Sequence, residues 1–268
     1  MRGLIAQTGS SDVWAFQPEG HAVPHLHPPA PALEDIGPGE LDADERSVIA
    51  LVGLAFEARI ASGPRVVVIC RNTERELSAS LQQALKRGCR SIISFGVAGG
   101  LAPHLRPGNW VVASSIVDAQ RAHPTDHTWS QKILAMIPGA EYRPIAGVDH
   151  AVASPEAKQK MHAETGAAVV DMESHLVARL ASTHGLSFAA VRVVIDPAHR
   201  VVPDAALAGM RPDGGTSVVA VMRELIMGPS QLSGLLRIAY DAYAARRALL
   251  HIRRRLGPDF GCFGLEQA

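Results

Sequence analysis

Four carboxylates stand where an apolar, strand-like run of the sequence ends. They are Glu57 in LAFEA, Asp171 and Glu173 in VVDMES, and Asp196 in VVIDP. Ligands of parallel sheets bind beyond the carboxyl ends of the strands, so these groups are predicted to meet at one rim. Asp171 and Glu173 point to the same side if the strand continues, whereas a turn after Asp171 separates them. In that case one of them is buried structurally and the other faces a ligand.

A glycine-rich segment, FGVAGG, follows another apolar run and is predicted to form a loop at the same rim. Backbone N–H groups of such a loop can bind an anion. The segment is not the G-x-G-x-x-G dinucleotide pattern, and glycines after a strand are often only a tight turn. Glu57 can likewise simply begin a helix, FEARIA, where a carboxylate favours the positive end.

The elements that must position these groups alternate between strand and helix. Strands are predicted at 48–54, 65–70, 91–97, 110–117, 167–170 and 188–195, and helices at roughly 72–87, 154–164 and 173–184. The strand runs are continuously apolar, as expected of strands covered on both faces. The sequence therefore predicts an α/β protein with three layers, α/β/α, around a mostly parallel mixed central sheet, in one domain.

The two ends of the chain differ from this middle. Residues 1–47 are rich in Pro, His, Gly and acid and are predicted to be a flexible extension, or an artefact of a start codon assigned too far upstream. The domain is predicted to span 48–268 and to end in helices at 217–227 and 232–256. The last helix has an apolar stripe and arginines on the opposite side. That basic face is either simply solvated or contacts anionic lipid headgroups.

Composition excludes several classes. The 26 basic and 26 acidic side chains cancel, and aromatics make up 4%, so nucleic acid is not an expected partner. Three widely spaced cysteines indicate neither a disulfide framework nor a zinc site and fit a reducing cytoplasm. No apolar run approaches the roughly 18 residues that span a bilayer. We expect a cytoplasmic protein, with peripheral contact at the inner membrane surface as an alternative.

The order of these motifs resembles the purine nucleoside phosphorylase and nucleosidase superfamily. LAFEA, FGVAGGL with RPGNWVVAS, VVDMES and FAAVRVVID cover nearly all of residues 48–200. Within that superfamily, LVGLAFEAR, FGVAGGL and the arginine-rich C-terminal helix most resemble the hopanoid-associated phosphorylases, which act on adenosylhopane. The resemblance implies an N-glycosidic-bond-cleaving enzyme without a cofactor or metal, and a homo-oligomer. Inorganic phosphate is a conceivable co-substrate.

The resemblance also implies roles for individual residues. Met172 and Glu173 match the pair that contacts the ribose hydroxyls, Asp196 matches the acid that protonates the departing purine at N7, and Glu57 matches the glutamate that activates water. Gly96, Val97, Gly99 and Gly100 match the loop against which phosphate or water lies. His150, in GVDHAV, is a further candidate for substrate contact. Two serines usual in the nucleosidases are replaced here by Val97 and Ile195, which leaves the handling of water or phosphate open.

Two other features are interpreted more simply. His123 and His127 are four apart, but Pro124 argues against a helix that would align them on a metal. Arg192, within the last strand, is predicted to form an internal ion pair.

The expected activity is removal of adenine from a 5′-substituted adenosine. Adenosylhopane would give a ribosyl or phosphoribosyl hopane in hopanoid side-chain biosynthesis, and its apolar tail would leave through an apolar mouth near the C-terminal helix. The alternatives are a methylthioadenosine or S-adenosylhomocysteine nucleosidase, and a non-catalytic nucleoside-binding or lipid-associated scaffold. The sequence does not decide between phosphorolysis and hydrolysis.

Overall fold

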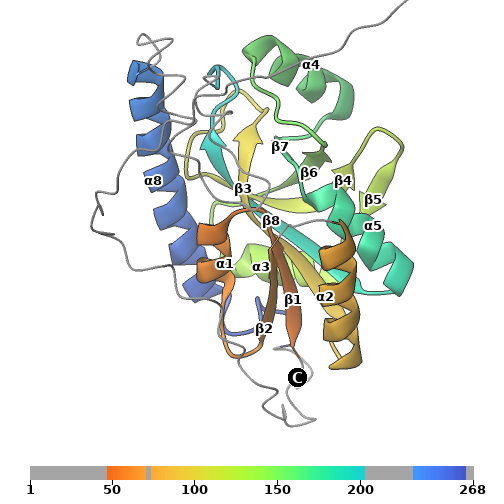
Figure 1. Cartoon of the computed structure of the whole chain (residues 1–268). Helices are drawn as coiled ribbons and strands as arrows, with labels where there is room; N and C mark the ends of the chain where they lie inside the picture. The colour runs from red at the N-terminus through yellow and green to blue at the C-terminus, as the bar shows by residue number, and fades with distance from the viewer. Residues whose placement is uncertain (1–46, 71–73, 203–231, 264–268) are drawn as a thin grey trace, which may run out of the picture. The chain divides into compact units, whose positions relative to one another are not determined.

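The sheet that carries the candidate site is made of the predicted strands and two more. The computed structural model describes residues 47–70, 74–202 and 232–263 (Figure 1). The predicted helix at 217–227 and nearly all of the N-terminal extension lie outside these ranges. The strands are β1 Val48–Val52, β2 Val66–Cys70, β3 Ser91–Gly100, β4 Trp110–Val117, β5 Ala122–Pro124, β6 Glu141–Gly147, β7 Val169–Asp171 and β8 Ser187–Asp196. All six predicted strands are present, whereas β5 and β6 were not predicted.

The helices follow the strands in near alternation. They are α1 Ala55–Ala61, α2 Glu74–Lys86, α3 His127–Met136, α4 Pro155–Thr165, α5 Ser174–His184 and α8 Leu232–Arg255. Their ends carry ordinary signals: Ser154 caps α4 by accepting from the N–H of Ala157, and Gly166 and Gly185 end α4 and α5 in the left-handed conformation. α3 was not predicted; Asp126 caps it by accepting from the N–H of Trp129.

The sheet is mixed and mostly parallel, as predicted. Its main path runs β2-β1-β3-β7-β6-β4-β5, and β8 pairs in parallel with β3 and antiparallel with β4. β3, β7, β6, β4 and β8 therefore pair with one another in a closed ring, while β1 and β2 extend it as an open sheet. The short β7 runs antiparallel to β3, and of β3 it pairs only with the last two residues, Gly99 and Gly100. The ends of β3, β7 and β8 consequently meet.

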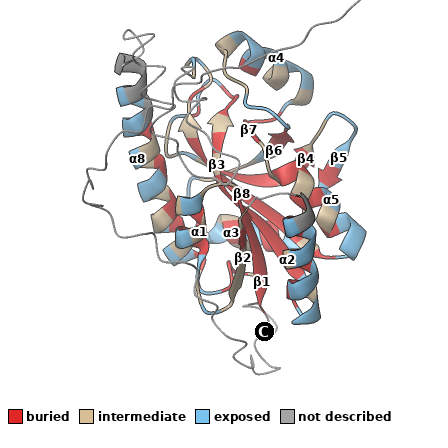
Figure 2. Cartoon of the chain, in the orientation of Figure 1, coloured by how far each residue is buried: buried red, intermediate tan, exposed pale blue. Residues whose placement is uncertain are grey.

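Helices cover both faces of the strands, which gives the three predicted layers. Along β1 the buried residues alternate between two hydrophobic clusters: Ile49 and Leu51 pack with α2 and α5, while Val48, Ala50 and Val52 pack with α1, α3 and α8. Figure 2 shows the strands as the most deeply buried elements between these helices. Burial on both faces explains why the strand sequences are continuously apolar.

The glycine-rich segment FGVAGG is a strand and not the loop that the sequence predicted. β3 continues through Gly100 because its last residues pair with two neighbours: Gly99 lies opposite both Val170 of β7 and Asp196 of β8. The glycines are needed for close approach. Gly96 lies under two buried charged side chains, as described below.

Candidate active site

Glu57 lies at the end of β1, in the first turn of α1, and its carboxylate is fully enclosed. The residue is 1% exposed. Its Oε2 accepts hydrogen bonds from the backbone N–H groups of Gly53 (2.9 Å) and Leu54 (2.8 Å), and its Oε1 accepts from the N–H of Val97 (2.7 Å). The carboxylate thus joins the end of β1 to β3. It also begins the helix, so the two interpretations that the sequence left open for Glu57 are compatible.

Arg192, in the middle of β8, lies among the carboxylates and is completely buried. Its Nε lies 2.7 Å from Asp171 Oδ2, and its Nη2 lies 3.6 Å from Glu173 Oε2. Nη2 also donates to the hydroxyls of Ser94 (2.6 Å) and Ser174 (3.1 Å). The predicted internal ion pair of Arg192 is confirmed, and its principal partner is Asp171.

The two carboxylates of VVDMES have separate positions because the chain turns after Asp171. Asp171 is 5% exposed; its Oδ1 accepts from the N–H groups of Glu173 (2.9 Å) and Ser174 (2.7 Å). Glu173 is the N-cap residue of α5. A turn with a structural aspartate and a second carboxylate at the rim is one of the two arrangements that the sequence predicted. Asp171 holds the turn and fixes Arg192, and Glu173 stands at the start of the helix.

Two glycines allow the carboxylates to approach the backbone closely. A Cβ at position 53 would lie 2.7 Å from Glu173 Oε1, and one at position 96 would lie 2.6 Å from Arg192 Nη1 and closer still to Glu57 Oε1. Carbon atoms do not approach polar atoms so closely without displacement. Gly53 and Gly96 therefore bring Glu57, Glu173 and Arg192 into one cluster, which lies after the end of β1 and beside the middle of β3 and β8.

Burial raises the pKa of Glu57 to about 7, from an ordinary value of 4.5. The positive charge of Arg192 opposes this shift, and the negative charge of Glu173 adds to it. A carboxyl group with a pKa near neutrality can accept a proton at one step of a reaction and return it later. Glu57 is therefore suited to act as a general base.

Asp196 ends β8 and is paired with a lysine that the sequence did not bring to attention. Lys158 of α4 is completely buried, and its Nζ donates to Asp196 Oδ2. The same ammonium donates to the carbonyl oxygens of Pro197 (3.3 Å) and Arg200 (3.1 Å). Both carboxyl oxygens lie beside Gly99, where a Cβ would be 3.3 Å from Oδ1 and 3.6 Å from Oδ2. The side chain of Asp196 is 14% exposed, so one edge of the carboxyl group reaches solvent.

The pKa of the Asp196 carboxyl is raised, chiefly because burial penalises its charged form. The charge and hydrogen bond of Lys158 and the charge of Arg200 act in the opposite direction. A raised pKa is what a proton-donating acid needs, and the buried strand before Asp196 supplies it.

The other predicted site residues lie around these groups. Met172 occupies the turn between β7 and α5, and Val97, Gly99 and Gly100 belong to β3. His150 is exposed in the turn after β6. In the same turn, the exposed Asp149 contacts a buried histidine of α5, with its Oδ1 3.1 Å from His175 Nε2. The structure thus places a histidine–aspartate pair beside the predicted position of His150.

The described residues provide no metal centre: within 47–70, 74–202 and 232–263, no three His, Cys, Asp or Glu side chains could hold a metal ion together. His123 and His127 are not on one helix. His123 lies in β5 with its Nε2 3.0 Å from Asp118 Oδ2, and His127 begins α3.

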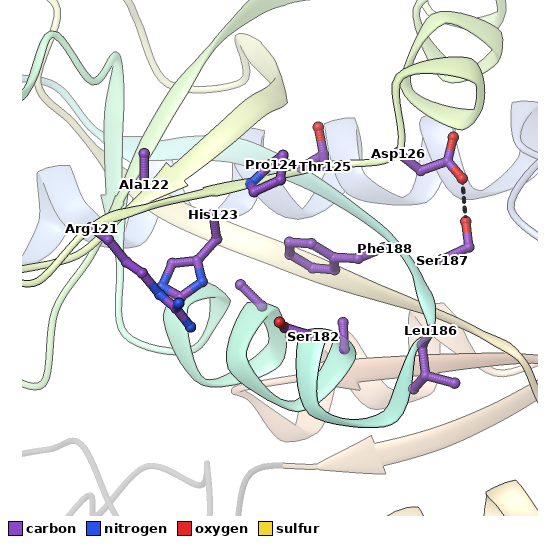
Figure 3. Close-up of a pocket in the computed structure, with 12 residues that line it drawn as sticks. Arg121, Ala122, His123, Pro124, Thr125, Asp126, Ser182, Leu186, Ser187 and Phe188 are labelled. Carbon is purple, nitrogen blue, oxygen red and sulfur yellow. Dashed lines mark hydrogen bonds between the residues drawn. The ribbon is translucent and has the colours of Figure 1, made fainter.

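A separate cavity of about 350 Å³ lies between β5, α5 and the beginning of β8 (Figure 3). Phe188 and Leu186 form part of its wall, and Ser187 donates to Asp126 at its edge (2.5 Å). None of the predicted site residues lines it. Phe188 and Asp196 are eight residues apart on one strand, which is about 26 Å at the usual rise. This cavity is therefore distinct from the carboxylate cluster.

The closed ring of strands, the helices on both faces and the carboxylates at the strand ends define a nucleoside phosphorylase-like α/β fold. A family model described as the phosphorylase superfamily matches residues 45–226, which is more than half of the chain. The chain belongs to this superfamily. The expected class, a nucleoside-cleaving enzyme of the phosphorylase and nucleosidase type, is thereby confirmed.

Solved structures show the same fold at low sequence identity. Futalosine hydrolase of Helicobacter pylori is 17% identical, with a TM-score of 0.53 over 68% of this chain and 99% of that one. The 5′-methylthioadenosine/S-adenosylhomocysteine nucleosidase of the same organism is 16% identical, with a TM-score of 0.55 over 80% and 100%. That of S. pneumoniae is 17% identical, with a TM-score of 0.52 over 76% and 99%. A comparison with curated proteins finds no match.

Sequence reasoning missed three contributors to the cluster. Ser94 and Ser174 carry no sequence signal, because serines within apolar strands and at helix starts are common. Lys158 stands in PEAKQKMHAET, where two lysines on a polar helix indicate a solvated face. Arg192, by contrast, is conspicuous in the sequence because a charge within FAAVRVVI must be paired when both faces of the strand are covered.

Proposed function

We propose that this protein hydrolyses the N-glycosidic bond of a 5′-substituted adenosine. The observation that carries the proposal is Glu57: a buried carboxyl with a pKa near 7, held by three backbone N–H groups beside Glu173. Such a group can take a proton from water at neutral pH, which hydrolysis requires and phosphorolysis does not.

The proposed reaction uses three carboxyl groups. Glu57 accepts a proton from water as the water oxygen attacks C1′ of the ribose. The C1′–N9 bond breaks, and its electron pair leaves with the adenine, which takes a proton at N7 from Asp196. Glu173 accepts hydrogen bonds from the ribose hydroxyls, Met172 packs against the ribose, and the negative charge of Glu173 stabilises the positive charge that develops on the sugar.

The hydrogen bonds that the backbone N–H groups already make favour water over phosphate as the nucleophile. The N–H of Val97 already donates to Glu57, and Gly99 and Gly100 lie in a paired strand. A phosphate placed there would be repelled by the carboxylates of Glu57 and Glu173. Arg192 lies nearby, but its charge is directed to Asp171. We therefore assign Gly96 and Val97 to the positioning of Glu57 and the attacking water, whereas Gly99 and Gly100 border Asp196.

Two substrates remain as candidates, and different observations favour them. The motif resemblance to the hopanoid-associated phosphorylases favours adenosylhopane, with product release into hopanoid side-chain biosynthesis. The solved structures with this fold include 5′-methylthioadenosine/S-adenosylhomocysteine nucleosidases, which favours those smaller substrates. Both substrates carry the same adenosine core, so the roles proposed for Glu57, Glu173 and Asp196 apply to either.

The test is adenine release from adenosylhopane and from methylthioadenosine, with and without inorganic phosphate, followed by mass spectrometry of the sugar product. The proposal expects release that does not depend on phosphate and a free ribosyl product. Phosphate-dependent release with a phosphorylated sugar would replace water by phosphate as the nucleophile. Release from neither substrate, under conditions where the protein is folded, would refute the proposal and favour a scaffold.

The α8 helix supplies the proposed contact with membranes that an apolar substrate requires. Within the described part of the chain no helix is long and apolar enough to cross a bilayer. Leu236 (63% exposed), Tyr240 (73%) and Tyr243 (58%) recur at the spacing of one helix face, and Arg247 lies over the Tyr243 ring. Aromatic and basic side chains on one face suit an anionic lipid surface.

Sedimentation with vesicles tests this contact. Binding of the protein to vesicles with anionic lipid, and not to neutral vesicles, is the expected result, with loss on Tyr240→Ser and Tyr243→Ser. Equal sedimentation with both kinds of vesicle, or with neither, would reject membrane contact through α8. The expected homo-oligomer is tested separately by light scattering, where a monomer mass would contradict it.

A further inference from the structure

The buried ammonium of Lys158 is fully occupied by one segment of the chain. Its three N–H donors match three oxygens: Oδ2 of Asp196 and the carbonyls of Pro197 and Arg200. All three belong to the segment 196–200, which begins with the last residue of β8. Lys158 comes from α4, a separate element, so a single side chain fixes this whole segment.

A buried lysine is unfavourable unless its charge is paired, so its placement here needs a reason. It is the residue that α4 buries most completely, and neighbouring Lys160 is exposed and pairs with Glu164 at 3.8 Å. Packing alone would be satisfied better by an apolar side chain at position 158. The lysine instead contacts the carboxyl group proposed to protonate the leaving base.

The contact leaves one carboxyl oxygen for the substrate. Oδ2 of Asp196 is held by the ammonium, so Oδ1 is the oxygen left for the substrate; both oxygens lie beside Gly99 at the end of β3. If Lys158 were absent, the carboxyl group could rotate about its Cβ–Cγ bond, and either oxygen could face the base. A displaced acid costs rate even when the substrate still binds.

We propose that Lys158 is a positioning residue of the proposed reaction: it fixes the carboxyl group of Asp196 so that Oδ1 faces the leaving base. This inference rests on the proposed function and adds a residue to it. Lys158 does not touch the substrate in this arrangement. It acts through Asp196, and its charge also limits how far burial raises the pKa of that acid.

The charged groups that face Asp196 come from two sides. Lys158 approaches from α4, and Arg200 approaches from the segment after β8, where it pairs with Asp241 of α8. Both cations lower the pKa of the carboxyl, and Lys158 does so through its charge and its hydrogen bond. Removal of Lys158 therefore raises the pKa of Asp196 further. The acid then stays protonated to higher pH, and the alkaline limit of activity moves upward.

The experiment compares adenine release by the wild type with that by Lys158→Met, which keeps the length of the side chain without its charge. We expect kcat to fall on the order of 10- to 100-fold, with KM nearly unchanged. The alkaline limb of the pH–rate profile should move to higher pH. Lys160→Met, on the exposed side of the same helix, should leave both kcat and the profile unchanged.

A second pair of variants separates this role from a purely structural one. If Lys158 acts through Asp196, Lys158→Met should have little further effect on kcat in an Asp196→Asn background. The double variant carries neither charge, so it can be measured even if the single Lys158→Met variant, which leaves the Asp196 carboxylate buried without its partner, does not fold. Multiplicative losses in the double variant would overturn the inference. So would an unchanged alkaline limb in Lys158→Met with full kcat.

A titration keeps the inference testable apart from activity. Carbonyl-¹³C NMR of labelled aspartate in the wild type and in Lys158→Arg reports the Asp196 pKa and the environment of its carboxyl carbon. We expect the pKa of Asp196 and the chemical shift of its carboxyl carbon to change in Lys158→Arg and to stay unchanged in Lys160→Met. If the wild type releases no adenine, the proposed function is wrong, whereas an Asp196 signal indifferent to position 158 refutes the role of Lys158 alone.

Discussion

Replacement of Glu57 by glutamine is the sharpest test of the proposed base. If water is activated by the ionised form of Glu57, kcat/KM of the wild type should rise with pH until the carboxyl is ionised, at about pH 7. At about pH 5, roughly one molecule in a hundred carries the ionised form, so the rate should be about 100-fold below its plateau. Glu57→Gln should lose this acid limb and about 10²- to 10⁴-fold of the plateau rate.

The raised pKa of Glu57 has a consequence for stability that requires no substrate. The folded state holds the proton of Glu57 up to about pH 7, whereas the unfolded chain releases it near 4.5. Between these values the folded state binds more protons, so the free energy of unfolding contributed by Glu57 falls as pH rises. The difference between the folded and unfolded pKa values corresponds to about 3 kcal/mol in total. Relative to the wild type, Glu57→Gln should therefore gain about 2 to 3 kcal/mol between about pH 5 and about pH 8.

Glutamine also introduces a mismatch, because its amide NH₂ must face one of the N–H groups that Glu57 accepts from. That cost, about 1 to 3 kcal/mol, does not depend on pH, so only the slope of the difference reports the carboxyl. Urea unfolding of both proteins across this pH range measures the slope. Glu164→Gln, whose side chain is 63% exposed, serves as the control and should show none.

The reasoning about Glu57 fails on either of two results. A wild-type rate that stays constant between about pH 5 and about pH 8 would mean that no group with a pKa near 7 must be ionised. A stability difference between the wild type and Glu57→Gln that does not change with pH would mean that burial does not raise the pKa of Glu57. The first result alone would remove its role as base and leave the structural description intact.

Three further predictions follow from the cluster. Gly96→Ala places a Cβ against two buried charged groups and should lower the stability by about 1 to 3 kcal/mol and reduce the activity. An unfolding curve and a rate equal to those of the wild type would contradict the close approach of these groups to Gly96. Arg192→Met leaves Asp171 and the other carboxylates without their cation, so it should destabilise the protein by about 3 to 5 kcal/mol. It should also move the acid limb of the pH–rate profile to higher pH, and an unmoved limb would contradict the coupling of Arg192 to Glu57. Glu173→Gln should lower kcat/KM for ribosides more than for the matching 2′,3′-dideoxy analogues. Equal losses would mean that Glu173 does not bind the ribose hydroxyls.

The sequence predicted most of the fold because buried parallel strands are unambiguous. Six strands with mostly apolar runs were located within a few residues, as were four of the helices, α2, α4, α5 and α8. β6 was missed because EYRPIAG carries charged residues and Pro144, which lies where the register of its pairing with β4 shifts. The glycines of β3 were expected in a loop because their pairing with β7 and β8 is a tertiary contact that a single sequence does not contain.

The positions of the carboxylates in the candidate site were predicted from the sequence, whereas the partners of its two buried cations were not. A carboxylate directly after a strand lies near the rim of the sheet, so the places of Glu57, Glu173 and Asp196 at the strand ends could be predicted, whereas their roles stay predictions. The partner of a buried cation depends on which strands are neighbours. Arg192 was predicted to pair internally because it shares a face with Asp196, whereas its partner is Asp171, and Lys158 was not distinguished from Lys160.

The two buried cations explain how carboxyl groups so close together can have different tasks. Arg192 contacts Asp171 at 2.7 Å and Glu173 at 3.6 Å, and it acts on Glu57 through space. Asp171, nearest to the cation and bound by backbone N–H groups, holds the turn after β7. Burial raises the pKa of Glu57 to about 7 against the opposing charge of Arg192, so Glu57 can exchange a proton near neutral pH. Lys158 pairs with Asp196 at the end of β8, so the proposed base and the proposed acid are each adjusted by a different cation.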